Sequence, residues 1–566
     1  MASNLVLLSY KPGIQQDGTD FQGDMCSNGQ WIRFQRGKVK KIGGMKAPAV
    51  LNGFDHLVAS DISLFPTNNA NQIFGYIAAS SGVYTVQVDQ QFNNTANQTT
   101  IIPNAPANIL WQSTTIINNN QRQIVFFGAS NALNIADNSA PVIYYGNIFD
   151  VGTSTLLNNT AVGINALING GMVYSAPYLF LYGSNGLVQY SASNNPLNFV
   201  IPVLTVPALG PNPTAAALAA YTSALAAYNT AKTVSPGSIN ISNDKVIYGR
   251  PIRGGPNSPV ILFWTLSSVV RLINVGDQTG ISFQKDVVST STSILSSKCV
   301  VEYDGLFFWP GTDRFFTYNG VVGEMVNITN LNYFYDNIDM DYRQKVFGVK
   351  NTKYGEIWWF YPEKIGAPNR LVNAPLGANT RALIYNVREN SWYDTQISRD
   401  AGFFSNDLGI MATYGASLAN YVSGNNWLWR HEFGFSESVE NVADALIPSS
   451  VTTPTFGWSS FNPASPSNTQ KAQPIDRWIE IRRIEPDFVA TPLANAATNM
   501  SVAVNTKIYA QSPSVRTNTY SFNAGSNGTD KIDTRDQGRQ MTLTFSSNHY
   551  FEMGNIMMLL GIGDGQ

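Results

Sequence analysis

The 566-residue chain is polar without being charged: 13% of its residues are charged and the formal net charge is −2, whereas 44% are hydrophobic and 12% aromatic. This apolar content is ample for large buried cores and excludes an intrinsically disordered chain. The scarcity of charge excludes a coiled coil, and the near-neutral balance excludes a general electrostatic attraction to nucleic acid.

Residues 1–44 are predicted to form an N-terminal arm that ends in a basic β-hairpin. Two short strands flank a turn at Arg36 and Gly37, and a pair of glycines ends the second strand. Alternation along the strands predicts an apolar inner face, with Ile32, Phe34 and Val39, and a basic outer face. The outer face comprises Arg33, Lys38 and Lys40.

The same hairpin is the most basic part of the chain, with no acidic residue among the bases. Its candidate contact residues are Arg33, Arg36, Lys38, Lys40 and Lys41. One hypothesis is that they contact DNA phosphates or an acidic surface of a partner protein. The alternative is an ordinary solvated hairpin face.

Residues 45–436 repeat one theme, a short apolar strand followed by a turn with Asn or Gly. Runs such as Tyr178–Tyr182, Val260–Trp264 and Glu356–Tyr361 are rich in aromatic and branched residues, which favours strands covered on both faces. The units recur about every 40 to 50 residues, the spacing of four-stranded sheets around a propeller. We therefore predict an all-β fold with a β-propeller of six or seven blade-like units, and one unit can be split between the two ends to close the ring.

One Ala-rich segment, residues 213–232, interrupts the repeat and is predicted to be a helical insertion. Its larger side chains follow one another at helical spacing and form a single stripe. The stripe comprises Leu218, Tyr221, Leu225 and Tyr228. Two interpretations stay open: the helix packs on its own propeller, or it is an inter-subunit helix that contacts another copy.

The composition changes after the propeller. Residues 437–476 are rich in Pro, Ser, Thr and Asn, which is typical of a linker or surface segment. In residues 477–566 apolar and polar positions alternate, as at Met541, Leu543 and Phe545. Such alternation indicates antiparallel strands with one buried face. We predict a β-sandwich-like platform built from this region and the N-terminal hairpin.

No motif for catalysis, cofactor binding or metal binding is found. The chain has no Gly-x-Ser-x-Gly elbow and no phosphate-binding loop, and its three histidines are not spaced as metal ligands. The acids near Asp339 lack the glycine and glutamate of a calcium loop, so we expect Asp339 to cap a short helix that begins at Met340. A glycosidase pair of carboxylates, which would meet only in space, stays open.

Several sequence features indicate the cellular compartment of the protein. Cys26 and Cys299 are far apart and are predicted to be free thiols in a reducing compartment. The short apolar run Leu5–Leu8 has no basic residue before it, so no signal peptide is expected. No apolar stretch reaches the length of a membrane-spanning helix. We therefore expect assembly in the cytoplasm.

A series of longer motifs follows one another along the chain. They are Trp31-Ile-Arg-Phe-Gln-Arg-Gly37, Lys41-Ile-Gly-Gly44, Val301-Glu-Tyr-Asp-Gly-Leu-Phe-Phe-Trp309, Phe316-Thr-Tyr-Asn-Gly320, Tyr342-Arg-Gln-Lys-Val346, Glu356-Ile-Trp-Trp-Phe-Tyr-Pro362, Leu383-Ile-Tyr-Asn-Val-Arg-Glu-Asn-Ser-Trp392 and Lys531-Ile-Asp-Thr-Arg535. In this order they resemble the tail hub or nozzle proteins of short-tailed phages (podoviruses), also called packaged-DNA stabilisation proteins. The helical segment 213–232 is a departure from that family.

The resemblance implies a non-enzymatic structural protein of the virion tail, without cofactor or metal, assembled in the host cytoplasm. Six copies form a homohexameric ring below the portal and bind the tail adaptor protein, through it the portal, and tail fibre, spike or needle proteins. The ring retains packaged double-stranded DNA and forms its ejection channel. It also implies roles for fold-motif residues, as turns at Gly305 and Gly320, blade cores at Trp309, Trp358, Trp359 and Trp392, and the end of an exposed strand at Pro362.

The composition agrees with such a ring, because interface cores are poor in charge and rich in aromatic residues. A near-neutral bore would also let DNA slide. The rival hypothesis is a β-propeller phage adhesin or glycan depolymerase, which would need clustered acids at the mouth of the propeller.

Overall fold

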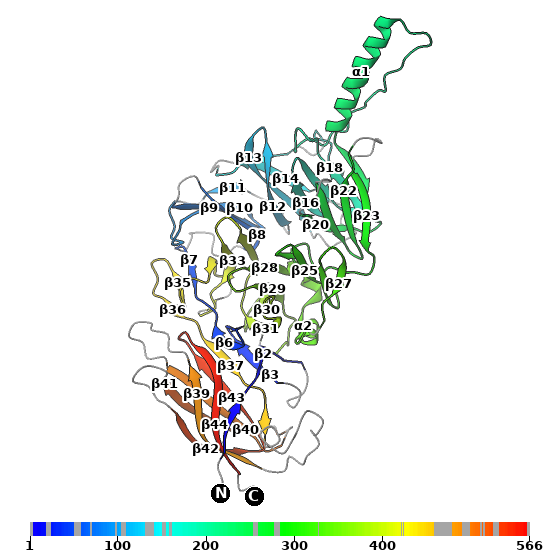
Figure 1. Ribbon diagram of the computed structural model, residues 1–566. Helices are drawn as coiled ribbons and strands as arrows, with labels where there is room; N and C mark the ends of the chain where they lie inside the picture. The colour runs from blue at the N-terminus through cyan, green and yellow to red at the C-terminus, as the bar shows by residue number, and fades with distance from the viewer. Residues whose placement is uncertain are drawn as a thin grey trace.

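The structure is a computed structural model of the chain. It describes the residues from Asn4 to Ile562, leaving out 18–23, 50–57, 68–70, 97–98, 104–108, 131–140, 150–153, 158–160, 253–258, 277–282, 327, 369, 420, 423, 458–477, 489–498, 510–511, 513–515 and 524–530. The described chain builds a β-propeller, a β platform that holds both termini, and a helix that projects from the far end of the propeller (Figure 1).

Seven sheets, here called blades 1 to 7 in chain order, form the propeller in the described residues, and blades 1 to 6 are antiparallel throughout. Blade 1 consists of β8 (Ala59–Pro66), β9 (Gln72–Ala79), β10 (Gly82–Asp89) and β11 (Thr100–Pro103). Blade 2 consists of β12 (Ile109–Asn118), β13 (Gln121–Ser130), β14 (Val142–Asn147) and β15 (Thr155–Leu156). Blade 3 consists of β16 (Gly171–Ser175), β17 (Tyr178–Tyr182), β18 (Leu187–Tyr190) and β19 (Gly237–Asn240).

The next three blades follow the same pattern. Blade 4 consists of β20 (Val246–Ile252), β21 (Val260–Thr265), β22 (Val269–Asn274) and β23 (Phe283–Ser289). Blade 5 consists of β24 (Val301–Tyr303), β25 (Leu306–Pro310), β26 (Phe315–Tyr318) and β27 (Val322–Glu324). Blade 6 consists of β28 (Phe347–Asn351), β29 (Glu356–Pro362), β30 (Asn379–Asn386) and β31 (Ser391–Gln396). Every residue of β21, β29 and β30 is buried, as expected for strands covered on both faces.

Blade 7 joins the two ends of the propeller segment. Its strands β32 (Ala401–Ser405), β33 (Ile410–Ala416) and β34 (Asn426–His431) are completed by β7 (Met45–Ala47), which pairs antiparallel with β34. On its other side β7 runs parallel to β35 (Ser436–Val439), which pairs with β36 (Ala445–Leu446). The predicted β-propeller is therefore confirmed, with one blade split between distant parts of the chain.

Two larger sheets form the platform. The first contains β42 (Ile532–Gly538), β39 (Ile479–Phe488), β44 (Glu552–Ile562), β6 (Lys38–Lys41) and β5 (Ile32–Gln35), with β1 (Asn4–Leu8) beside β44. The second contains β4 (Asn28–Gln30), β37 (Ser449–Thr452), β43 (Gln540–Ser547), β40 (Asn499–Lys507) and β41 (Arg516–Asn523), with β38 (Phe456–Gly457) beside β43. The short strands β2 (Lys11–Ile14) and β3 (Met25–Cys26) pair in parallel. The platform thus combines N- and C-terminal strands, as the fold prediction states.

The segment predicted as a linker, 437–476, differs from the expectation. Residues 458–476 lie outside the described residues, but the part before them forms strands of both the propeller and the platform. In β37, Ser449 and Val451 are buried while their neighbours are half-buried. The high Ser and Thr content suggested a loop, yet these residues alternate as a half-buried strand requires.

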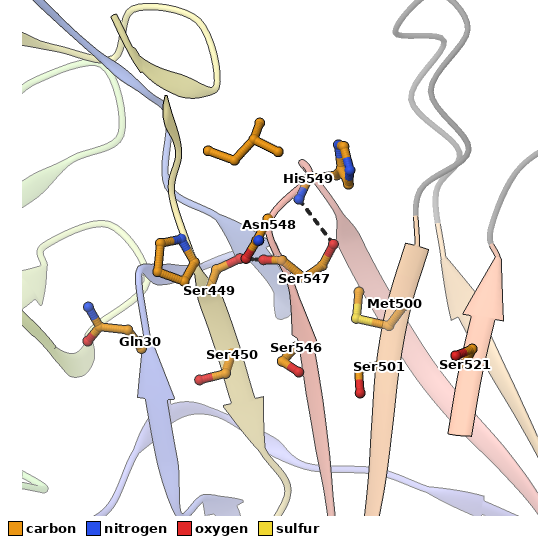
Figure 2. Close-up of a pocket in the computed structure, with 12 residues that line it drawn as sticks. Gln30, Ser449, Ser450, Met500, Ser501, Ser521, Ser546, Ser547, Asn548 and His549 are labelled. Carbon is orange, nitrogen blue, oxygen red and sulfur yellow. Dashed lines mark hydrogen bonds between the residues drawn. The ribbon is translucent and has the colours of Figure 1, made fainter. Parts of the chain in front are cut away.

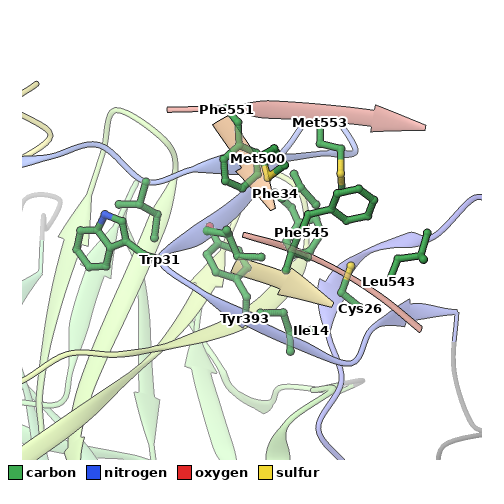
Figure 3. Close-up of a cluster of buried hydrophobic side chains, with 14 of the residues drawn as sticks. Ile14, Cys26, Trp31, Phe34, Tyr393, Met500, Leu543, Phe545, Phe551 and Met553 are labelled. Carbon is green, nitrogen blue, oxygen red and sulfur yellow. The ribbon is translucent and has the colours of Figure 1, made fainter. Parts of the chain in front are cut away.

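The platform and the propeller share one hydrophobic core. Trp31 and Phe34 of the hairpin pack in the same cluster as Tyr393 of blade 6 and Phe545 and Met553 of the platform (Figure 3). The rings of Trp31 and Trp358 meet edge to face with centroids 6.1 Å apart. Burial of each such large side chain contributes about 1.5–3 kcal/mol, so this junction couples the two domains.

The described residues form few helices. Helix α1 (Ala215–Val234) lies between β18 and β19, and α2 (Leu331–Asn337) precedes a 3₁₀ helix over Met340–Lys345. A further 3₁₀ turn spans Ser184–Gly186. The carboxylate of Asp339 accepts a hydrogen bond from the backbone N–H of Asp341 at 3.2 Å, which confirms the predicted cap.

Candidate functional site

The basic hairpin lies between the platform and the propeller. Strands β5 and β6 form the edge of the first platform sheet, and Arg36 and Gly37 at the turn have the positive φ angles of 54° and 74° that a tight hairpin uses. The other side of the hairpin meets blades 6 and 7. Both faces are therefore covered, so the predicted outward basic face is wrong for Arg33.

Arg33 is 1% exposed and forms an internal ion pair. Its Nε lies 2.8 Å from Oε1 of Glu356 in blade 6, and its Nη1 donates a hydrogen bond to Oε2 of Glu432 at 3.1 Å. The guanidinium also lies 3.6 Å from the centre of the Tyr354 ring. These acids are 323 and 399 residues away in the sequence, so no local motif could link them to Arg33.

The charge of Arg33 is shared between the two carboxylates. Burial lowers the pKa of Arg33, but the negative charges of Glu356 and Glu432 outweigh it and hold that pKa above its usual range. Burial raises the pKa of Glu356, and the charge of Arg33 opposes this shift. Glu356 also accepts hydrogen bonds from the Tyr393 hydroxyl at 2.6 Å and the Trp358 indole at 2.9 Å. The network therefore fixes the hairpin to blade 6.

Lys41 is also an internal residue rather than a surface contact. It is 1% exposed, and its Nζ donates hydrogen bonds of 2.6 Å to the backbone carbonyls of Ile447 and Asn548. Among the described residues no carboxylate forms an ion pair with Lys41, and burial lowers its pKa to about 7. The prediction that Lys41 contacts DNA or a partner is therefore wrong, because a buried ammonium cannot reach either of them.

The three remaining bases lie nearer the surface. Arg36 is exposed, and its backbone N–H donates to Oε1 of Glu389 in blade 6 at 2.8 Å. Lys38 and Lys40 are half-buried, and Nζ of Lys40 lies 3.9 Å from a carboxylate oxygen of Glu552. The five bases thus do not form one patch, and only these three stay open as contacts for a partner.

The axis of the propeller holds a narrow channel of about 450 Å³. Residues from the first strand of every blade line it, including Asp61, Gln112, Tyr174, Tyr248 and Lys350. Sequence repeats predicted the blades but gave no indication of these polar side chains, because the inner strand of each blade carries a different residue at the channel.

An ion pair spans this channel. Nζ of Lys298, just before blade 5, lies 2.7 Å from Oδ1 of Asp61 in blade 1, and the Ser113 hydroxyl donates to the other oxygen at 2.5 Å. Glu302 accepts from Lys350 at 3.0 Å. The lining carboxylates of Asp61 and Glu302 are therefore each paired with a lysine, unlike an acid pair prepared for glycoside hydrolysis, in which one carboxyl must hold a proton.

A second hollow, of about 700 Å³, lies on the second platform sheet (Figure 2). Cross-strand pairing places Ser450 opposite Gln30 and Ser546, and Ser501 opposite Ser546 and Ser521. The row therefore crosses five strands, and the described residues that line the hollow include no carboxylate or basic Lys or Arg. These hydroxyls form an uncharged hydrogen-bonding surface without the acid that a serine triad requires.

The fold-motif residues lie in blades 5 and 6. Gly305 and Gly320 have positive φ angles of 83° and 112° at turns. The four motif tryptophans are buried, with Trp358 in the junction core and the other three, Trp309, Trp359 and Trp392, in the core of the blades. The expectation that Pro362 ends an exposed strand is wrong. Its strand, β29, is buried throughout and pairs with β30.

The helical insertion extends away from the propeller. No residue of α1 is buried, and in Figure 1 the helix points away from the sheets on the side opposite the platform. Leu218 is 49% exposed, and Tyr221, Leu225 and Tyr228 are half-buried. The interpretation in which α1 packs on its own propeller is therefore wrong, and that of an inter-subunit helix stays a prediction.

Two features of other classes of protein are missing from the described residues. No group of three or more His, Cys, Asp or Glu side chains is placed there to hold a metal ion. Neither α1 nor any other described helix combines the length and apolarity needed to span a bilayer.

No protein-family model and no curated protein matches the sequence. Among solved structures, BBS1N in complex with ARL6DN matches 70% of this chain and 97% of its own at 8% identity, with a TM-score of 0.37. The computationally designed Ika8 protein matches 69% and 99% at 8% identity and a TM-score of 0.32. An ancestral GH74 enzyme matches 72% and 51% at 10% identity and a TM-score of 0.37. Likenesses of this size carry no inference about function.

Proposed function

We propose that this protein is a structural subunit of a phage tail, which forms the nozzle or hub ring below the portal and adaptor. In the virion, six copies retain the packaged DNA and enclose the channel through which it is ejected. Its partners are other copies of the chain, the tail adaptor, the fibre, spike or needle proteins, and the passing duplex. The proposal includes no enzymatic step.

The observation that carries the proposal is the series of family motifs over residues 301–392. These motifs supply strands of blades 5 and 6, and three of their tryptophans, Trp309, Trp359 and Trp392, fill the cores of the blades. The N-terminal motif forms the hairpin that joins the platform to blade 6 through Arg33. The motifs resembling the family thus occupy connected positions that hold the two domains together, which supports a common architecture.

The channel geometry supports a bore formed between subunits rather than within one. The axial channel of the propeller measures about 450 Å³ and is spanned by the Lys298–Asp61 ion pair, so a DNA duplex cannot pass along it. DNA would instead pass through the centre of a ring of copies. The formal net charge of −2 for each chain suits such a bore, because few phosphates would be held by counterion release.

The decisive experiment is cryo-electron microscopy of the phage particle, combined with depletion of this protein during assembly. We expect a hexameric ring coaxial with the portal, and we expect depleted heads to release DNA that becomes sensitive to nuclease. A peripheral position, or depleted heads that retain DNA normally, would contradict the proposal.

The rival function as an adhesin or depolymerase has its own readout. Purified protein is incubated with host surface glycan, and new reducing ends or retained glycan are measured. Cleavage that disappears in Glu302→Gln would favour the depolymerase, whereas the nozzle proposal expects neither cleavage nor retention.

A further inference from the structure

The projecting arm formed by residues 200–235 has an unusual surface. It contains no Asp, Glu, Lys, Arg or His from Val200 to Ala231, although it is almost entirely exposed. Val203 is 97% exposed and Val206 is 62% exposed. Apolar side chains that a soluble protein exposes together on one projection are typical of a surface that another molecule covers.

The stripe on α1 has the periodicity of a helix that packs against another helix. Leu218, Tyr221, Leu225 and Tyr228 are separated by three, four and three residues, which is the 3.5-residue repeat of the a and d positions of a heptad. The positions beside the stripe carry small side chains, which are Ala217, Thr222, Ala224 and Ala231. Small flanking residues let two helix backbones approach closely.

Within the chain this stripe is only partly covered, because Leu218 is 49% exposed and Tyr221, Leu225 and Tyr228 are half-buried. The other described α-helix has seven residues and lies at Leu331–Asn337, next to blades 5 and 6. An isolated helix of this length is only marginally stable in water, even when it is rich in alanine. None of the 20 residues of α1 is buried in its own chain, so α1 has little of the packing that normally stabilises a helix.

The absence of charge on the arm favours α1 of a second copy as the helix that covers the stripe. An uncharged surface gives no attraction to DNA or to an acidic or basic partner. Between identical helices it also avoids the like-charge repulsion that limits self-association. Each copy of the chain brings one such helix, so a second copy supplies a complementary surface without any further protein.

We propose that α1 helices of neighbouring copies pack together in a parallel, in-register bundle through Leu218, Tyr221, Leu225 and Tyr228. The parallel direction rests on the proposed ring, because copies related by rotation about one axis point their helices the same way along it. The bundle lies at the end of the assembly opposite the platforms, where Figure 1 places α1.

Disulfide crosslinking of the full chain tests this arrangement. Leu225→Cys places a thiol in the stripe, and Ser223→Cys places one on the opposite face of the same helix. The native Cys26 and Cys299 are buried and give little background. Under mild oxidation we expect a crosslinked dimer of this chain for Leu225→Cys and loss of that species for Ser223→Cys.

Equal crosslinking of the two variants, absence of crosslinking in both, or a product containing a different protein would overturn the proposal. Crosslinking only in a mixture of Leu218→Cys with Tyr228→Cys would show antiparallel packing and overturn the parallel bundle. A ring in the phage particle with separated helices would leave the nozzle function intact, whereas crosslinked helices in an assembly without such a ring would leave the bundle intact.

A second pair of variants keeps the test independent of thiol chemistry. Leu225→Asp introduces a charge into the stripe, and Ser223→Asp introduces the same charge outside it. No residue of α1 is buried in its own chain, so both variants should fold, which the melting temperature verifies. We expect only Leu225→Asp to shift the assembly to smaller species by light scattering.

Discussion

At the scale of single residues, the charges at the junction serve the fold rather than a ligand. Arg33 neutralises Glu356 and Glu432, and all three lie between the hairpin and the propeller. Removal of one partner from a buried ion pair costs more than its presence gains, because the remaining charge is left without compensation. Arg33 therefore helps to hold the hairpin against the propeller.

We expect Arg33→Met to lower the free energy of unfolding by about 3–5 kcal/mol, because two buried carboxylates lose their counterion. The matched control is Arg36→Gln at the exposed hairpin turn, which should change stability by less than about 0.5 kcal/mol. Urea denaturation at neutral pH measures both. Equal effects of the two variants would mean that Arg33 is not the junction charge described above.

Because Lys41 is buried, we expect the free energy of unfolding to depend on pH. Burial lowers its pKa from the ordinary 10.5 to about 7, so between these values the folded state has lost a proton that the unfolded chain still holds. Stability therefore rises with pH across this window by at most about 1.4 kcal/mol per unit, and Lys41 contributes no slope below or above it.

We expect Lys41→Met to remove this slope, since Met carries no proton. Chemical denaturation of both proteins at several pH values between about 7 and 10 measures the difference. Lys38→Met on the same strand is the control, because its half-buried side chain should leave the slope in place. Parallel pH profiles for wild type and Lys41→Met would refute the role assigned to this ammonium.

At the scale of elements, strand and hairpin positions could be predicted from sequence, whereas the faces they cover could not. The period-two pattern identified β5 and β6, and it correctly placed Phe34 and Val39 inside. It placed Arg33 outside because alternation assumes one wet face, and here the second face meets a distant blade. The channel and the row of serines could not be predicted from the sequence either, because each combines one side chain from each of several strands.

The closing of the propeller depends on the short strand β7. Just before it, the Gly44 N–H donates to the Gly434 carbonyl at 2.8 Å, and the Gly44 carbonyl accepts from the N–H of Phe433 at 3.0 Å. A Cβ at Gly44 would overlap the backbone of Ser436 and lie 2.8 Å from the carbonyl oxygen of Phe433. Only glycine allows this approach of two backbones.

We expect Gly44→Ala to destabilise the protein by about 1–3 kcal/mol, the usual cost of overpacking, and to speed amide exchange in β34, the neighbour of β7. Gly323→Ala in β27 is the control, because its Cβ would meet only a Thr317 methyl at 3.8 Å. Mass-spectrometric hydrogen exchange measures the effect. Unchanged exchange in β34 would show that β7 contributes little to closure.

At the scale of the whole molecule, the shared core predicts cooperative unfolding. Trp31 connects the hairpin to Trp358 of blade 6, while Phe545 and Met553 bring the platform into the same cluster. Two domains joined by a large apolar contact and a buried ion pair should melt as one unit rather than separately. We expect a single calorimetric transition for the wild-type chain.

Trp31→Ala should divide that transition into two, because it removes the side chain at the centre of the junction and costs about 3–5 kcal/mol. Trp111→Ala is the matched control: Trp111 is equally buried, but it packs in the core between blades 1 and 2. The control should lower the melting temperature while keeping one transition. If both variants keep one transition, or if the wild type already shows two, the junction does not couple the domains. A coupled junction would let force applied to the platform reach the propeller and α1 without separating the domains, which the proposed tail ring would need in order to hold packaged DNA.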